Sequence, residues 1–155
     1  MKAQYINPFI ESIETVFDTM LSTSIQRLNA RATKDGSVHE GDWLTSIIGI
    51  SGQASGAVAL SFPKATALQL AGTFLSTEIA EINDEVTDAI AELANMVGGS
   101  AKAKFDLEPP PELSLPTVVT GHDYKTKFPT KSVWIEVPFG SPVGEFLMEV
   151  SFSKD

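Results

Sequence analysis

Hydrophobic residues recur every three or four positions in three stretches of the chain, the spacing of one face of an α-helix. The first stretch covers residues 6–21, where Asn7 is suited to cap a helix and Pro8 to occupy its first position. The others cover about 63–75, which begins at a proline, and about 83–104. In the last, acidic residues gather in the first turns and lysines near the end, as the helix dipole favours. The pattern predicts three helices.

Other stretches have the composition of β-strands. Residues 43–50 and 56–62 are rich in apolar residues and flank a small polar turn at 51–55, so they predict a hairpin. Three prolines at 109–111 exclude a continuation of the third helix and predict a loop there. The other predicted features are a short strand and a loop within 27–41, strands at 113–120, 132–139 and 145–152, and a turn at 140–144.

Apolar and polar residues alternate along most of the last predicted strand. Its apolar positions are Phe146, Met148, Val150 and Phe152, and its polar positions are Glu145, Glu149 and Ser151. Such alternation is typical of a sheet with one face on the core and one in water. The sequence therefore predicts a single α+β domain over 1–155, with an antiparallel sheet that carries the long helices on one face and leaves the other face wet.

Composition narrows the class of protein. The chain has 155 residues, a net charge of −9 and no cysteine. The charge argues against binding to nucleic acid or to an anionic membrane surface, because neither would attract an acidic protein. The absence of cysteine excludes disulfides and thiolate metal sites. There is no apolar run of the length of a signal peptide or a membrane span, so we expect a soluble, cytoplasmic protein.

The third predicted helix carries the residues with the clearest chemical character. Its apolar, core-facing positions are Val86, Ala89, Ile90, Leu93, Val97 and Ala101. Asp88, Glu92, Asn95 and Gly99 fall on the opposite face at steps of four, three and four residues. A carboxylate and a carboxamide side by side could hold a cation of a partner and a water molecule. A solvated polar row, which any amphipathic helix has, explains the same spacing.

Weak helix formers make this stretch unusual. Asn95, Gly98 and Gly99 each cost helix stability relative to alanine, by about half a kcal/mol for asparagine and about 1 kcal/mol for each glycine. Such residues indicate the close approach of another backbone. That backbone could belong to a partner or to the same chain.

Several segments together resemble a known family. They are Asn7-Pro8-Phe9, Ile50-Ser51-Gly52, Val58 to Pro63, the helix with Asp88, Glu92 and Asn95 followed by Gly98-Gly99, and the proline-bearing segment Leu113 to Val119. Over nearly its whole length the chain resembles the CheC/CheX/FliY group of bacterial chemotaxis phosphatases, most closely the CheX branch. CheC carries two such helices, whereas this chain has one Glu-x2-Asn pair, since Glu14 and Phe17 occupy these positions in the first helix.

The resemblance implies hydrolysis of the aspartyl phosphate on a response-regulator receiver domain of the CheY type. Asn95 would orient the attacking water, Glu92 would pair with the receiver's lysine, and Asp88, Gly98 and Gly99 would contact the partner. The resemblance implies no cofactor or metal in this chain, with Mg²⁺ in the receiver, and a homodimer joined through sheet edges. The alternative is a non-catalytic adaptor that binds a receiver or motor component through the same helix.

Other candidate sites are weaker. The glycine-rich segment 49–56 lies between two strands and lacks the Gly-Lys-Ser/Thr of a phosphate-binding loop. His39 and His122 lack the spacing of metal ligands, which favours surface or structural roles. A basic island formed by Lys125, Lys127 and Lys131 is either a solvated loop or a contact for an acidic receiver surface.

Overall fold

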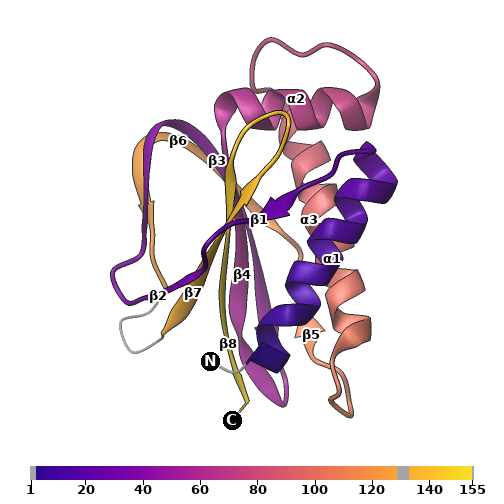
Figure 1. The fold of residues 1–155 in the computed structure, drawn as a ribbon, viewed down its shortest axis with the longest axis vertical. Helices are drawn as coiled ribbons and strands as arrows, with labels where there is room; N and C mark the ends of the chain where they lie inside the picture. Colours follow the sequence, from indigo (N-terminus) through magenta and orange to yellow (C-terminus); the bar gives the residue numbers. More distant parts are fainter. Residues whose placement is uncertain (1–2, 129–132, 155) are drawn as a thin grey trace.

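The computed structural model describes residues 3–128 and 133–154, and within them it contains three helices and eight strands (Figure 1). The helices are α1 (Ala3–Leu21), α2 (Lys64–Leu75) and α3 (Asp84–Lys104). The strands are β1 (Gln26–Arg27), β2 (Arg31–Thr33), β3 (Ser37–Ser51), β4 (Ala54–Pro63), β5 (Glu112–Leu113), β6 (Thr117–Thr126), β7 (Trp134–Gly140) and β8 (Phe146–Lys154).

The strands form one antiparallel sheet in the order β1-β7-β8-β4-β3-β5, with β2 also paired to β7 and β6 also paired to β3. The predicted hairpin is confirmed, because β3 and β4 pair from Trp43 opposite Pro63 to Ile50 opposite Gly56. Both β3 and β6 are longer than predicted. Pro116 separates β5 from β6, as expected of a residue that lacks the N–H a strand ladder needs.

The helices cover one face of the sheet, as the sequence predicts (Figure 1). Phe146 of β8 lies at the centre of the core between the two layers. Its ring stacks on Phe17 of α1 at 5.1 Å and on Phe139 of β7 at 5.4 Å. Fully burying a side chain of this kind stabilises the fold by roughly 1.5–3 kcal/mol, so these contacts fix α1 against the sheet.

The start of α1 differs from the prediction. Helical structure is already present at Ala3, and Pro8 lies inside the helix rather than at its first position. Asn7 is therefore not its cap. Pro8 is the sixth helical residue, beyond the first four N–H groups that lack a helical partner, so it removes one backbone hydrogen bond of the helix. The buried side chains of α1, among them Phe9, Ile13 and Phe17, offset that loss.

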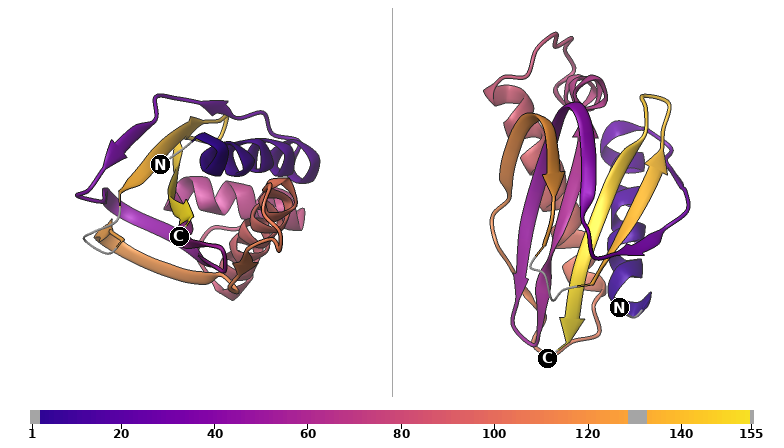
Figure 2. Two further views of the ribbon diagram at one scale, coloured as in Figure 1. Left: turned by 90° about the horizontal axis from the view of Figure 1, so that it is seen from below. Right: turned by 90° about the vertical axis from the view of Figure 1, so that its left-hand side faces the viewer.

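The second face of the sheet also differs from the prediction. Glu149 was expected in water, yet it is completely buried, and Ser151 is only 9% exposed. Figure 2 shows the reason: the sheet curls on the side away from the helices, so that the outer parts of β2 and β7 and of β3 and β6 form two walls. Polar side chains on this face bond to one another between the walls. Strand alternation identified the face correctly but not its curvature.

Candidate functional site

Helix α3 is held in place by its caps and by its buried face. Asn83 precedes it, and the Asn83 side-chain oxygen accepts a 3.0 Å hydrogen bond from the Val86 N–H. Acidic residues occupy its first turn and lysines its last, which matches the helix dipole. All six positions of the predicted apolar stripe are buried, together with Ala94 and Gly98. The stripe therefore fixes which residues α3 presents to solvent.

The opposite face of α3 brings the predicted site residues together. Asp88, Glu92, Asn95 and Gly99 are all exposed and follow one another along the helix. Within the described part of the chain, no hydrogen bond or ion pair engages the side chain of Glu92 or Asn95. Their carboxylate and carboxamide groups are therefore available to a partner. No hydrogen bond or ion pair among the described residues supports a structural role for this pair.

The two glycines play different parts. Gly98 is buried, and a β-carbon there would lie 3.2 Å from a methyl of Leu113 and 3.4 Å from one of Ile48. Packing of α3 against β3 and β5 thus accounts for Gly98, which corrects the expectation that it contacts a partner directly. Gly99 is exposed, and a β-carbon there would meet nothing within 4 Å. Of the two glycines, Gly99 has the open surroundings that contact with a partner requires.

The Glu92–Asn95 pair, which we call the dyad, lies on the exposed face of α3. A hollow of about 680 Å³ lies between α2 and the loop that follows it, lined by residues that include Leu68, Gly72 and Ile79. Neither Glu92 nor Asn95 lines it. Small-molecule sites are typically concave, whereas a pair on an exposed helix is accessible to a protein surface. The geometry favours a macromolecular substrate.

The other candidates from the sequence have ordinary environments or lie elsewhere. His122 is exposed between Asp42 at 2.8 Å and Asp123 at 3.2 Å, and a hydrogen bond to Asp42 and the charge of Asp123 raise its pKa. In the described ranges, no group of three histidine or acidic side chains is placed to hold a metal ion. No described helix is long and apolar enough to cross a membrane.

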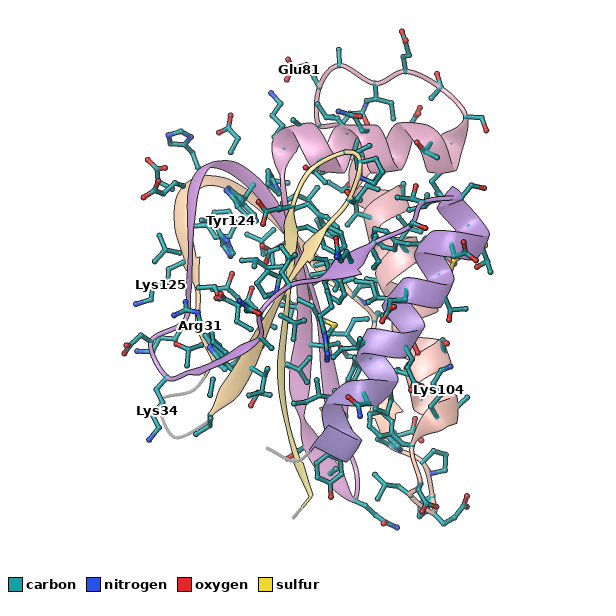
Figure 3. All side chains as sticks on the ribbon, in the orientation of Figure 1. Arg31, Lys34, Glu81, Lys104, Tyr124 and Lys125 are labelled. Atoms are coloured by element: carbon teal, nitrogen blue, oxygen red, sulfur yellow. The ribbon has the colours of Figure 1, made fainter. Side chains whose placement is uncertain are left out.

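The described part of the basic island lies at the end of β6. Lys125 lies on β6, on the side of the molecule away from α3 (Figure 3). Lys127 is exposed just beyond β6, and Lys131 falls outside the described residues. Lys125 is therefore not part of the face of α3 that carries Glu92 and Asn95.

One group of residues was not anticipated from the sequence. His39, Glu136 and Glu149 come together in the curled side of the sheet with several hydroxyl side chains, and all three are buried. Burial raises the pKa of Glu149 to about 8 and lowers that of His39. The only signal in the sequence is the presence of ionisable residues at alternating strand positions, which solvent exposure explains as well.

Known proteins resemble this chain throughout its length. Residues 44–140, which include α2 and α3 with Glu92 and Asn95, match the family model of chemotaxis phosphatase CheX. CheY-P phosphatase CheX of Thermotoga maritima is 29% identical over 130 residues, which are 82% of each chain. A CheC-like superfamily protein from Shewanella sp. PV-4 has a TM-score of 0.89 at 29% identity and 99% coverage of both chains.

A further structure shows the same fold at greater sequence distance. The CheX of a Borrelia burgdorferi CheX-CheY-BeF3-Mg complex has a TM-score of 0.76 at 20% identity, with 97% of this chain and 98% of that chain covered. The family match includes the dyad helix and the central hairpin, and the neighbours reproduce the arrangement of helices on one face of an antiparallel sheet. This chain belongs to the CheX family of chemotaxis phosphatases.

Proposed function

We propose that this protein hydrolyses the aspartyl phosphate of a CheY-like receiver domain. The observation that carries the proposal is the exposed Glu92–Asn95 pair, which has no partner among the described residues and lies on a capped helix with a buried apolar face in a CheX-family fold. The relative from Thermotoga maritima, named a CheY-P phosphatase, supports the same reaction. A cytoplasmic location follows, because receiver domains of this type are cytoplasmic partners.

The chemistry of phosphoryl transfer suits a site with few groups. Catalysis depends mainly on positioning and on electrostatic stabilisation, and little covalent chemistry is needed from the protein. In our proposal the Asn95 carboxamide enters the receiver's active site and holds a water in line with the acyl phosphate. Glu92 accepts a charge-assisted hydrogen bond from the receiver's lysine and so fixes the orientation of the two proteins. Mg²⁺ belongs to the receiver, and this chain supplies no ligand to it.

Asp88 and Gly99 extend the site along the helix in both directions. Asp88 lies one turn before Glu92 and adds a second carboxylate for a basic group of the receiver. Gly99 lies one turn after Asn95, and the open space around it lets the receiver's backbone approach α3 closely. The site is therefore acidic on one side of Asn95 and sterically open on the other.

The experiment is the decay of a phosphorylated receiver from the same organism, measured with and without this protein. Asn95→Ala should abolish the acceleration yet still bind the receiver, because the amide acts on water and Glu92 makes the orienting contact. Glu92→Ala should weaken binding. Asn7→Ala, the control, removes an amide from an exposed position of α1. It should leave receiver binding and the acceleration of decay unchanged. Full acceleration by Asn95→Ala would contradict the catalytic role.

The same assay separates the phosphatase from the alternative adaptor. An adaptor would bind the receiver through α3 without shortening the lifetime of the phosphoryl group. Binding without acceleration by the wild-type protein, across the receivers of its organism, would favour the adaptor.

We also propose that the protein is a homodimer joined through a sheet edge. Strand β6 has ten residues and pairs on one side with β3, while in the described part of the chain no strand covers its other side. An uncovered edge strand of this length is a template for pairing with another chain. At the opposite end of the sheet, β7 is covered by the short strands β1 and β2. The geometry thus favours β6 as the dimer edge.

A further inference from the structure

Two carboxyl groups lie side by side on the curled face of the sheet. Glu136 of β7 is directly opposite Glu149 of β8 in the strand register. Arg31 of β2 contacts Glu136 through two hydrogen bonds of 3.0 and 3.3 Å. Within the described residues, no lysine or arginine forms an ion pair with Glu149, which is completely buried. Arg31 is therefore the cation beside these two carboxyl groups, and it is bound to Glu136.

Hydrogen bonds connect Glu149 to the far edge of the sheet. Ser61 of β4 donates to Glu149 at 3.2 Å and contacts Thr45 of β3 at 2.8 Å. Thr45 in turn contacts the Tyr124 hydroxyl of β6 at 2.7 Å. This chain of bonds crosses four neighbouring strands from β8 to β6. These bonds therefore link Glu149 to the edge strand β6.

His39 reaches the same carboxyl group from the opposite wall. Its Nε2 lies 3.9 Å from an oxygen of Glu149 and 2.7 Å from the Thr126 hydroxyl of β6. Its Nδ1 and the second oxygen of Glu149 have no partner among the described residues. Ser37, at the start of β3, completes the enclosure by donating a hydrogen bond to Glu136.

These contacts hold down a distinct part of the sheet, which we call the arm: residues 37–43 of β3 and 121–126 of β6. The two strands pair with each other, and the register shifts between His39 and Asp42. Gly41, inside that irregularity, has a φ of +83°, a conformation that favours glycine. Val38 of the arm is 66% exposed. The arm thus has its own bend, and polar side chains supply much of its inner contact.

The charges in the enclosure are determined by burial. The groups that face Glu149 are Glu136 of β7, His39 of β3, Tyr124 of β6 and, through Glu136, Arg31 of β2. Burial raises the pKa of Glu149 to about 8, so its carboxyl group is protonated at neutral pH. Burial lowers the pKa of His39, so the ring is neutral. For Glu136, burial acts to raise the pKa, but the bonds from Arg31 and Ser37 outweigh it and lower the pKa, so this group is ionised.

We infer that a single buried proton, carried by Glu149 beside ionised Glu136, holds the arm closed over the back of the sheet, and that loss of this proton releases the arm. The reason is electrostatic, because a second carboxylate in the enclosure would be unpaired, next to a like charge and away from water, which is strongly unfavourable. Opening the arm would return that charge to solvent. This property is independent of the dyad on α3.

The direction of the pH dependence follows from proton linkage. Glu149 has a higher pKa when the arm is closed than when it is solvated, so the closed state binds the proton more tightly. The opening equilibrium should rise by up to about tenfold per pH unit between pH 6.5 and 8, then level off. Above pH 6.5 His39 is neutral in both states, so it does not oppose this change.

Hydrogen exchange followed by mass spectrometry tests the inference. The protection of peptides from the arm is compared between wild type and Glu149→Gln at each pH, so that the chemical exchange rate cancels. Glutamine mimics the protonated acid, so Glu149→Gln should keep the arm protected across pH 6.5–8.5 while wild type loses protection. Glu145→Gln, at an exposed position just before β8, is the matched control and should follow wild type. Equal pH slopes in wild type and Glu149→Gln would overturn the inference.

Two more readouts keep the test decisive. Peptides of α3 in the same samples report opening of the whole molecule, and an equal pH effect there would show a global loss of stability rather than release of the arm. The infrared band of a protonated carboxylic acid should be present in the wild type at pH 6.5, vanish by pH 9.5 and be absent from Glu149→Gln. Its absence from the wild type at pH 6.5 would show that Glu149 is ionised, and the inference would fail even if the variant did not fold.

Discussion

Asn95 and Gly99 lie one helical turn apart on the exposed face of α3, and neither residue stabilises the helix. Relative to alanine, asparagine costs about half a kcal/mol and glycine about 1 kcal/mol at such a position. Gly98 has a reason in the packing of Leu113 and Ile48, whereas the space around Gly99 is open. In the proposed function, the close approach of a receiver accounts for both residues.

Gly99→Ala should therefore separate stability from function. The variant should be more stable than wild type by roughly 0.5–1 kcal/mol, because alanine favours the helix and its methyl group meets nothing in the chain. It should at the same time bind a phosphorylated receiver more weakly. Urea unfolding and a receiver-binding titration measure the two effects. A variant that gains stability and binds as well as wild type would show that Gly99 is not part of the docking surface.

At the scale of elements, the N-terminal cap of α3 lies away from the site that the helix carries. The Asn83 side chain accepts a hydrogen bond from the Val86 N–H, and the dyad begins more than two turns later. The cap therefore contributes to the stability of the helix that carries the site without contacting the site.

Asn83→Ala should lower the free energy of unfolding by about 1 kcal/mol, within the 0.5–2 kcal/mol range of lost caps. The acceleration of receiver dephosphorylation by the folded variant should be unchanged. Asn29→Ala, in the exposed connection between β1 and β2, is the control and should leave stability unchanged. An equal effect of the two substitutions on the urea midpoint would contradict the capping role of Asn83.

The elements that could be predicted from the sequence are those with a strong local signal. The helical period of the core-facing residues located α2 and α3 to within about a residue, and the alternating and apolar runs located the central hairpin. The start of α1 could not be predicted, because buried residues compensate for Pro8 inside the helix. The exposed row with Glu92 and Asn95 followed from periodicity, but its meaning depended on the family resemblance. The opposite roles of Gly98 and Gly99 required the positions of Leu113 and Ile48.

At the scale of the whole molecule, the curl of the sheet could not be predicted from local patterns in the sequence. It depends on contacts between segments far apart in the chain, such as Ser37 with Glu136 and His39 with Thr126. Strand alternation places Glu149 on the second face, but only the curvature of the sheet makes that face an interior. Among the described residues β6 pairs with β3 alone, and its other side is the basis for the proposed dimer.

Val119→Lys should shift the protein from dimer to monomer, because Val119 lies on β6 with 42% of its surface exposed and a charge there disfavours edge pairing. Val133→Lys, at a similarly exposed residue just before β7, should leave the dimer intact. Sedimentation equilibrium at micromolar concentration measures both. A monomeric wild type, or an intact Val119→Lys dimer, would contradict pairing through β6.

The placement of the two tryptophans has a practical consequence. Trp43 packs on the His39 ring at 4.5 Å, and Trp134 packs on Phe128 at 4.2 Å, so both indoles lie on the sheet and none lies on a helix. Intrinsic fluorescence will thus respond to movements of the curled strands and stay nearly constant when a ligand occupies α3. Titrations with a receiver need a label on that receiver or on α3, whereas the sheet can be followed in the unlabelled protein.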